Sequence, residues 1–147
     1  MKEDNTNVKV LTFKNSSLEV LMNILNIPLH GSEARLRNKF ISLIDKQLTV
    51  IRNEKQRILH KYTKKDESGN LKTIEEGKNL DIPSEDFKKI QNEMNEFLEK
   101  KHTIEISERN KSAIKLVTKL VLETNKTFDV KDGTNYDEVA QSFENIK

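Results

Sequence analysis

The stretch from Ser32 to Lys65 constrains the fold most, because it is the longest helical pattern in the chain and holds no Gly or Pro. Its apolar residues recur at steps of three and four, which places them on one stripe of a helix. They are Leu36, Phe40, Leu43, Ile44, Leu48, Ile51, Ile58 and Tyr62. Such a helix is about 45 to 50 Å long. It needs partners along its length, so we expect the other helices to pack against it.

Length and composition indicate one domain, residues 1–147, with a modest core. Hydrophobic and charged residues each make up 34% of the chain, which favours an elongated helical shape. The absence of cysteine excludes disulfides and thiolate metal sites. No segment approaches the roughly 20 apolar residues of a membrane span. We therefore expect a soluble, intracellular protein.

The residues before the long helix predict a strand and a short helix. Residues 8–14 alternate with a period of two, which is typical of a strand. Ser16 and Glu19 form a capping box for a helix from Ser17 to about Asn26. Ser32 is the expected cap of the long helix.

The residues after the long helix predict a tip and two further long helices. Residues 66–83 are polar and are expected to form a mobile tip, with a small hairpin in it. Ser84 opens a helix that should run back antiparallel to the first. Ser107 is the expected cap of a third long helix, from Glu108 to about Asn125, whose wide apolar arc indicates the most buried helix of the set.

Short elements complete the expected fold. Thr103–Ile106 and Thr127–Val130 read as brief strands, Asp132-Gly133 as a turn, and Thr134 as the start of a final helix. The expected fold class is mainly α, with an elongated antiparallel hairpin or bundle of three long helices, short terminal helices, and a small element of two or three strands.

No catalytic, metal or cofactor motif is present in the sequence. His30, His60 and His102 lie far apart, and none has a partner at a metal-binding helical offset. The four glycines stand singly, so no phosphate-binding loop forms. Carboxylate pairs such as Glu75-Glu76 lie in polar tips or in the first turns of helices. There they cap the helix or face solvent. We therefore expect a non-enzymatic protein without metal or cofactor.

Charge is segregated along the chain. Residues 35–65 carry a net charge of +8, and residues 66–99 carry a net charge of −6. On a helical wheel five basic residues of the long helix point away from its apolar stripe, namely Arg35, Lys39, Lys46, Arg57 and Lys64. The acids of the next helix, including Glu93, also lie opposite its apolar stripe. We therefore expect few salt bridges between the two helices, and a basic face that meets solvent or a partner.

The partner-binding residues expected on this evidence are Arg35, Arg37, Lys39, Lys46, Arg57 and Lys64. A solvated helix face is the plain interpretation. An acidic protein partner or a phosphate backbone would also fit this surface. The lack of tryptophan and of aromatic residues among these cations argues against stacking on single strands.

The segment Ile27-Pro28-Leu29-His30-Gly31-Ser32-Glu33-Ala34-Arg35-Leu36-Arg37-Asn38-Lys39-Phe40 resembles a family of small uncharacterised proteins from phages and prophages of low-GC Gram-positive bacteria. Members carry a Leu-Pro-Leu segment, a glycine, and a Ser-Arg-x-Arg element with an aromatic that opens a long charged helix. The polar turn at 66–70, Tyr136-Asp137-Glu138 and Ser142-Phe143-Glu144 extend the likeness. Here Ala34 occupies the serine position. The resemblance implies a phage origin and the cytoplasm of a bacterial host, and it supplies no activity.

Arg35 and Arg37 stand in the first turns of the helix, where the dipole disfavours cations by roughly 0.3 to 1 kcal/mol each. Two arginines kept there indicate a carboxylate or phosphate contact. The contact is either internal, to Asp137, Glu138 or Glu144, or external.

The leading hypothesis is a phage protein that binds a host or viral protein, as a host-takeover factor, an anti-defence inhibitor or an assembly helper. Its surface would be the basic stripe and the tip. The alternatives are a nucleic-acid-binding protein that uses the same stripe and a structural component of the virion or tail. A homodimer through Ile41, Leu59 and Leu122, which lie off the main stripes, is also open.

Overall fold

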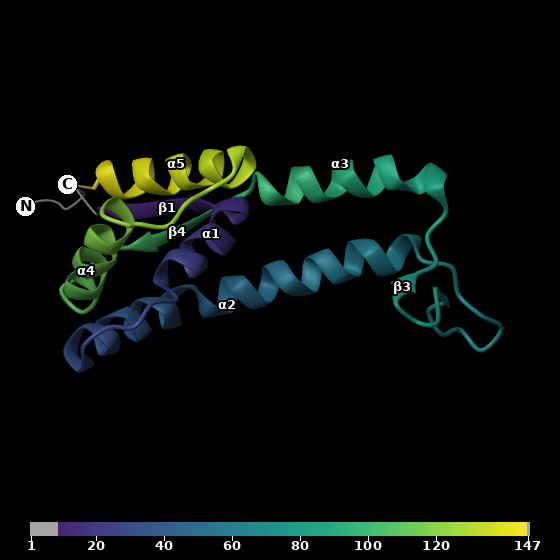
Figure 1. The fold of residues 1–147 in the computed structure, drawn as a ribbon, viewed down its shortest axis with the longest axis horizontal. Helices are drawn as coiled ribbons and strands as arrows, with labels where there is room; N and C mark the ends of the chain where they lie inside the picture. The colour runs from purple at the N-terminus through teal and green to yellow at the C-terminus, as the bar shows by residue number, and fades with distance from the viewer. Residues whose placement is uncertain (1–8, 147) are drawn as a thin grey trace, which may run out of the picture. The chain divides into compact units, whose positions relative to one another are not determined.

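The structure is a computed structural model that describes residues 9–146 (Figure 1). It is mainly helical with small antiparallel β elements, which confirms the coarse fold class. The elements in chain order are β1 (Val10–Lys14), α1 (Asn15–Leu25), α2 (Gly31–Tyr62), β2 (Thr73–Ile74), β3 (Asn79–Leu80), a 3-10 turn η2 (Ser84–Asp86), α3 (Phe87–Leu98), β4 (Lys101–Glu105), α4 (Lys111–Leu122) and α5 (Val130–Glu144). The three-helix hairpin is not confirmed, because α3 and α4 have only 12 residues each.

The helix predicted from the apolar spacing is present and unbroken. α2 has 32 residues and begins at Gly31, one residue before the expected start. Its first hydrogen bond runs from the Ala34 amide to the His30 carbonyl, so His30 and not Ser32 precedes the first turn. Length and composition predicted one domain for residues 1–147. Their contacts form two compact units, residues 1–48 with 100–147 and residues 49–99, and α2 passes from one to the other.

The first unit holds the larger core. α1 packs against α4, α5 and β1, and seven of its 11 residues are buried. The expectation that the third long helix would be the most buried is therefore wrong, since α4 buries five of 12. Phe143 of α5 is fully buried, with its ring centroid 5.5 Å from that of Phe13 and 6.2 Å from that of Phe40. These rings join β1, α2 and α5 in one core.

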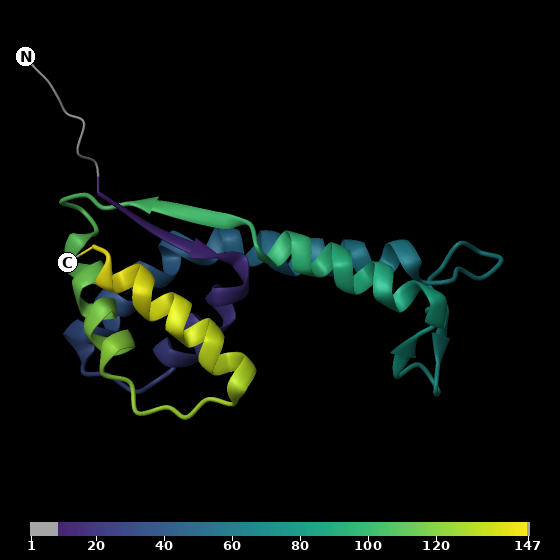
Figure 2. The same cartoon turned by 90° about the horizontal axis from the view of Figure 1, so that it is seen from above.

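β1 and β4 form a two-stranded antiparallel sheet in this unit, in the register Val10↔Glu105 to Lys14↔Lys101. The strand expected near Thr103 is thus confirmed. β1 lies between β4 and α5 (Figure 2). Leu11 and Phe13 turn their side chains into the core, whereas Val10 remains 42% exposed. The alternation of β1 therefore gives one buried face, as period-two patterning requires.

Several expected caps and ends in this unit are wrong. Ser16 lies inside α1, which starts at Asn15 without a side-chain cap. α4 starts at Lys111, after a turn in which the Asn110 side chain accepts from the Ser107 amide and donates to the Glu105 carbonyl.

The expected strand at 127–130, the turn at Asp132-Gly133 and the helix start at Thr134 are also wrong. α5 begins at Val130 and includes Gly133. Asp129 supplies its N-cap, because the Asp129 carboxylate accepts from the Asp132 amide at 2.8 Å. A local cap thus outweighs the turn propensity of Asp-Gly.

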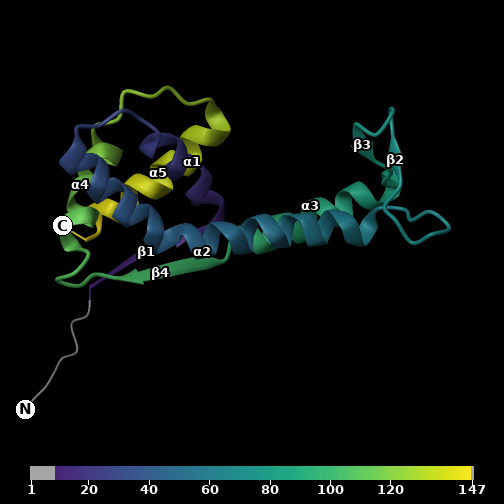
Figure 3. The same ribbon diagram turned by 90° about the horizontal axis from the view of Figure 1, so that it is seen from below.

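The second unit consists of the C-terminal part of α2, the tip, η2 and α3. Ile51, Ile58 and Ile90 supply its buried aliphatic side chains. The tip contains the expected small hairpin, in which Thr73 pairs with Leu80 and Ile74 with Asn79 (Figure 3). Hydrogen bonds from the Lys64 amide to the Asp81 carbonyl and from the Lys72 amide to the Lys64 carbonyl hold the base of the tip.

Candidate functional site

Three of the six predicted binding residues form one exposed surface on the N-terminal part of α2. Arg35, Lys39 and Lys46 are all exposed. At 100° per residue they fall within an arc of about 40° and extend over about 16 Å of the helix. None of the three forms an ion pair with another residue in the described part of the chain, 9–146. We call these three residues the basic face.

Arg37 lies apart from this surface, because its guanidinium is used inside the protein. It is half-buried and donates to the carbonyl oxygens of Leu25, at 3.2 Å, and Ile27. These carbonyls end α1 and begin the joint before α2. Of the internal and external contacts left open for the two arginines, Arg37 makes an internal one, but its acceptors are main-chain oxygens and not the carboxylates of the last helix. Glu138 pairs instead with Lys14, at 3.2 Å.

Arg57 and Lys64 belong to the second unit and are also exposed. Arg57 donates through Nε and Nη2 to the carboxylate of Glu54, three residues earlier, at 2.8 and 2.7 Å. This hydrogen bond, followed by the charge of Glu54, raises the pKa of Arg57. Arg57 is therefore already paired, whereas Lys64 makes no ion pair within residues 9–146.

Glu93 of α3 contacts α2 and forms a salt bridge between two helices for which few salt bridges were expected. The Tyr62 hydroxyl donates to its Oε2, and the Lys61 ammonium lies 3.1 Å from its Oε1. The Tyr62 hydrogen bond, then the Lys61 hydrogen bond, lowers the pKa of Glu93 below its usual value. The Glu93 hydrogen bond in turn raises the pKa values of Tyr62 and Lys61. This cluster closes the end of α2 onto α3.

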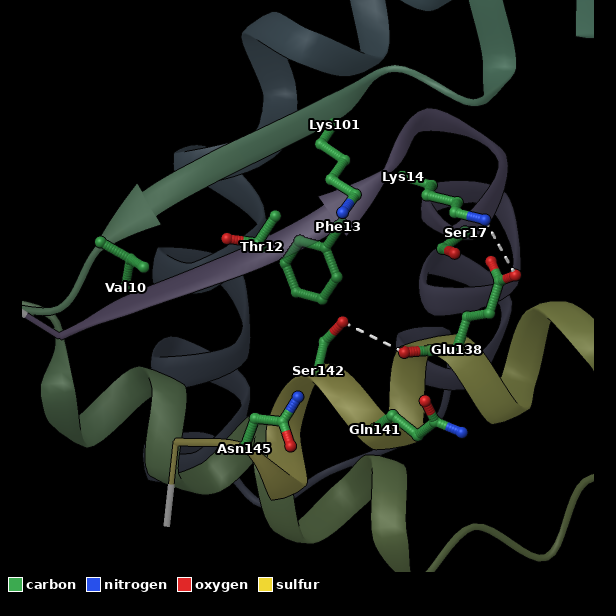
Figure 4. A pocket seen from close by; sticks show the side chains of 10 residues that line it. All are labelled: Val10, Thr12, Phe13, Lys14, Ser17, Lys101, Glu138, Gln141, Ser142 and Asn145. Carbon is green, nitrogen blue, oxygen red and sulfur yellow. Dashed lines mark hydrogen bonds and ion pairs between the residues drawn. The ribbon is translucent and has the colours of Figure 1, made fainter.

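A groove of about 490 Å³ lies between β1 and α5 in the first unit (Figure 4). Its lining residues are Val10, Thr12, Phe13, Lys14, Ser17, Lys101, Glu138, Gln141, Ser142 and Asn145. We call it the β1 groove. Lys14, Ser17 and Glu138 lie toward one end of it in Figure 4, and Val10 and Asn145 lie toward the other. No sequence pattern predicts this groove, because its two walls come from segments more than 100 residues apart.

The free edge of β1 forms one wall of the β1 groove. The Ile106 amide donates to the Lys9 carbonyl and the Asn15 amide to the Lys100 carbonyl, so the odd-numbered residues of β1 bond to β4. The amide and carbonyl groups of Val10 and Thr12 must then point away from β4. Neither residue has a further main-chain hydrogen bond within the described chain. The alternating pattern of residues 8–14 is the only sequence signal for this edge.

The hydroxyl of Ser17 is an unusual group in this region. The residue is 1% exposed, and its Oγ has no hydrogen-bond partner among residues 9–146. Lys101, which stands opposite Lys14 in the sheet register, is exposed and forms no ion pair with the described residues. The lining of the β1 groove therefore includes one lysine that pairs with Glu138 and one without an ion pair in residues 9–146, and the Ser17 hydroxyl lies beside Lys14 in Figure 4.

The three histidines do not come together. Burial lowers the pKa of His102, which lies in β4 opposite Phe13. Within residues 9–146, no group of three histidine, aspartate or glutamate side chains is placed to hold a metal ion. No helix in the same described range is long and apolar enough to cross a bilayer.

Comparison of the chain with protein-family models, with curated proteins and with solved structures gave no match. The functional assignment therefore depends on the chemistry of the two surfaces described above.

Proposed function

We propose that this chain is a non-enzymatic binding protein of phage origin, and that its basic face holds an acidic surface of a host or viral protein. The observation that carries the proposal is the alignment of Arg35, Lys39 and Lys46 on one exposed side of a continuous helix, without a carboxylate partner in residues 9–146. The phage origin is supported by the resemblance of residues 27–40 alone.

Electrostatic cost supports a binding role for the basic face. Arg35 and Lys39 are like charges at positions i and i+4, which destabilises a helix by roughly 0.2 to 0.5 kcal/mol. Arg35 also lies in the second turn of α2, close to the positive end of the helix dipole. An acidic partner surface removes both penalties and speeds association by steering.

A protein partner fits the basic face better than a nucleic acid. The three cations lie in one short row of about 16 Å, whereas proteins that bind duplex DNA commonly neutralise more phosphates than three cations can, on the order of six to ten. The basic face also has no aromatic side chain for base stacking. A nucleic-acid role therefore remains the alternative outcome of the experiment below.

The test compares two triple charge reversals in the first unit. Arg35→Glu, Lys39→Glu and Lys46→Glu reverse the basic face. The control reverses Lys111, Lys115 and Lys119, which are exposed on α4 at steps of four residues, with Lys111 paired to Glu108. Proteins captured from lysate of infected host cells are quantified by mass spectrometry for the wild type and both variants. Far-UV circular dichroism checks that each variant keeps its helix content.

We expect a partner that the wild type and the α4 variant capture and that the α2 variant loses. If the α2 variant retains the wild-type set of proteins, the proposal is wrong. If both variants lose it equally, net charge and not the basic face controls binding, and the proposal is again wrong. Retention on duplex DNA that falls steeply with salt, without a captured protein, would favour the nucleic-acid alternative.

A further inference from the structure

A second groove of the first unit, of about 680 Å³, lies where α1 ends and α2 begins. Its apolar lining includes Met22 of α1, Ile27 and Pro28 of the joint, and Ile41 of α2. Met22 and Ile41 are half-buried, so each keeps part of its surface exposed. Arg37 is the one charged residue that lines this groove, and no carboxylate from the described part of the chain lines it. We call it the joint groove.

Arg37 is held so that one edge of its guanidinium stays available. Its Nη1 donates to the carbonyl oxygens of Leu25 and Ile27, which orients the plane of the group. Its Nε donates to the Oδ1 of Asn38 at 3.3 Å, and its Nη2 has no hydrogen bond with residues 9–146. Nε and Nη2 form an edge that can bind a carboxylate through two parallel hydrogen bonds. A carboxylate in the joint groove would therefore meet an arginine that is already oriented.

Three asparagine side chains indicate what carries this carboxylate. Asn23, Asn26 and Asn38 line the joint groove and are exposed. The first two side chains have no hydrogen bond within the range 9–146, and the third only accepts from Arg37. An asparagine amide both donates and accepts, as a peptide group does. An extended segment offers its peptide groups for such contacts, whereas a helix uses them internally. The amides therefore favour an extended protein segment over a small organic acid.

The spacing along α2 sets the spacing of the side chains in that segment. Arg37 and Ile41 lie about one turn apart on the same side of the helix, which is about 6 Å along its axis. Residues i and i+2 of an extended chain lie on the same side, about 6.6 Å apart. The segment therefore needs an acidic and an apolar residue with one residue between them.

We propose that the joint groove binds an extended segment of a partner protein. An Asp or Glu side chain of the segment pairs with Arg37, and an apolar side chain two residues away packs on Ile41 and Met22. The complementary charge of Arg37 and the free asparagine amides carry this assignment. Arg37 lies on a different side of α2 from Arg35 and Lys39 of the basic face, so the site does not depend on the function proposed above.

The first experiment tests the spacing with defined probes. Dye-labelled, amidated peptides of about seven residues carry one Glu and one Leu among Ser and Thr. The Leu stands from one to four positions before or after the Glu. Binding to the full-length chain is measured by fluorescence anisotropy. We expect the affinity to peak at a separation of two, and replacing the Glu of that peptide by Gln should weaken it about five- to tenfold.

The second experiment occupies the free edge of Arg37 from within the chain. Asn38→Asp places a carboxylate where the Asn38 Oδ1 already accepts from Nε, so it should pair with the guanidinium and repel the Glu of the peptide. We expect this variant to bind the Glu peptide about tenfold more weakly than the wild type, and to bind the Glu and Gln peptides equally.

The matched control is Asn53→Asp, which changes the net charge equally at an exposed position of α2 outside the joint groove. It should bind the peptide like the wild type. Far-UV circular dichroism checks that both variants keep their helix content. Equal weakening by the two substitutions would show that net charge and not Arg37 controls binding, and the proposal would be wrong.

NMR of the wild type gives a readout that does not depend on any substitution. On addition of the peptide, the Nε–H signal of Arg37 and the methyl signal of Met22 should shift. The proposal is overturned if no peptide of the series binds, if neither signal moves, or if hexanoate alone binds as tightly as the peptide. It is also overturned if the free chain is a dimer that Ile41→Gln converts to a monomer, because a second copy then occupies the groove.

Discussion

The guanidinium of Arg37 donates to the carbonyl oxygen of Leu25 at 3.2 Å, which ties the end of α1 to the second turn of α2. The same nitrogen also donates to the Ile27 carbonyl. The last carbonyls of a helix have no amide donor within it, so donors from outside the helix satisfy them, and the Leu25 carbonyl also accepts from the Ile27 amide at 3.0 Å. Arg37 fills that role across a joint that contains Pro28.

Removal of this donor should destabilise the protein. Arg37→Ala is expected to lower the free energy of unfolding by about 1 to 3 kcal/mol, because charged hydrogen bonds to half-buried carbonyls are lost. Arg35→Ala, two residues earlier on the exposed side, is the control and should change it by less than about 0.5 kcal/mol. Urea unfolding followed by circular dichroism measures both. Equal effects of the two substitutions would show that Arg37 has no special structural role.

Phe143 is the ring on which the core of the first unit depends. Phe143→Ala should cost about 3 to 5 kcal/mol, because it opens a cavity between Phe13 and Phe40. Val130→Ala, at a side chain that is 90% exposed in the same helix, should cost little. Thermal unfolding compares the two variants. A small loss for Phe143→Ala would mean that the three rings do not form one packed cluster.

Asp129 is the expected stabilising cap of α5. Asp129→Ala should reduce stability by about 0.5 to 2 kcal/mol, whereas Asp129→Asn should retain most of it, since the amide oxygen still accepts from the Asp132 amide. Thr134→Ala tests the start that the sequence suggested and should have a smaller effect, because Thr134 is exposed within the helix. Denaturant midpoints of the three variants decide between the two starts.

The buried hydroxyl of Ser17 should reduce the stability of the folded protein. Ser17→Ala is expected to raise the free energy of unfolding by about 1 kcal/mol, because it removes a buried group without a described partner and improves helix propensity. Ser16→Ala, in the same helix but half-buried, controls for propensity alone. If the two substitutions stabilise the protein equally, or if Ser17→Ala destabilises it, the Ser17 hydroxyl has a hydrogen-bond partner in solution and the prediction is wrong.

Tyr62 should control the titration of Glu93. Its hydrogen bond is the largest cause of the lowered pKa of Glu93, so Tyr62→Phe should move that pKa up toward the ordinary value of 4.5. Tyr136→Phe in the first unit serves as the control and should leave Glu93 unchanged. NMR titration of the side-chain carboxyl carbons measures the pKa directly.

The sign of the accompanying stability change follows from the same shift. Because the folded pKa of Glu93 lies below the unfolded one, its contribution is present above about pH 4.5 and is lost as the pH falls through the folded pKa. Glu93→Gln should therefore be less stable than the wild type at neutral pH and approach it in acid. A pH-independent difference between them would contradict the ionised hydrogen bond.

Sequence patterns were sufficient to predict those helices and strands whose formation depends mainly on their own residues. The apolar spacing of residues 32–65 predicted α2 to within three residues at its C-terminal end. This was possible because the helical period of the apolar residues, and the face that they bury, can be read from one segment alone. The period-two run near Val10 likewise predicted β1. The exposure of Arg35, Lys39 and Lys46 follows from the same wheel, since residues opposite a buried stripe must face outward.

The tertiary structure decided those contacts that join segments far apart in the sequence. The wheel already turns Arg37 away from Arg35 and toward the edge of the apolar stripe, but only the folded joint places the carbonyls of Leu25 and Ile27 where Arg37 can donate to them. Glu93 meets Tyr62 only because α3 returns along α2. The β1 groove exists because β4 takes one edge of β1 and α5 stands beside the other. A helical or strand period is a local quantity, whereas pairing, capping and grooves require segments that only the folded chain brings together.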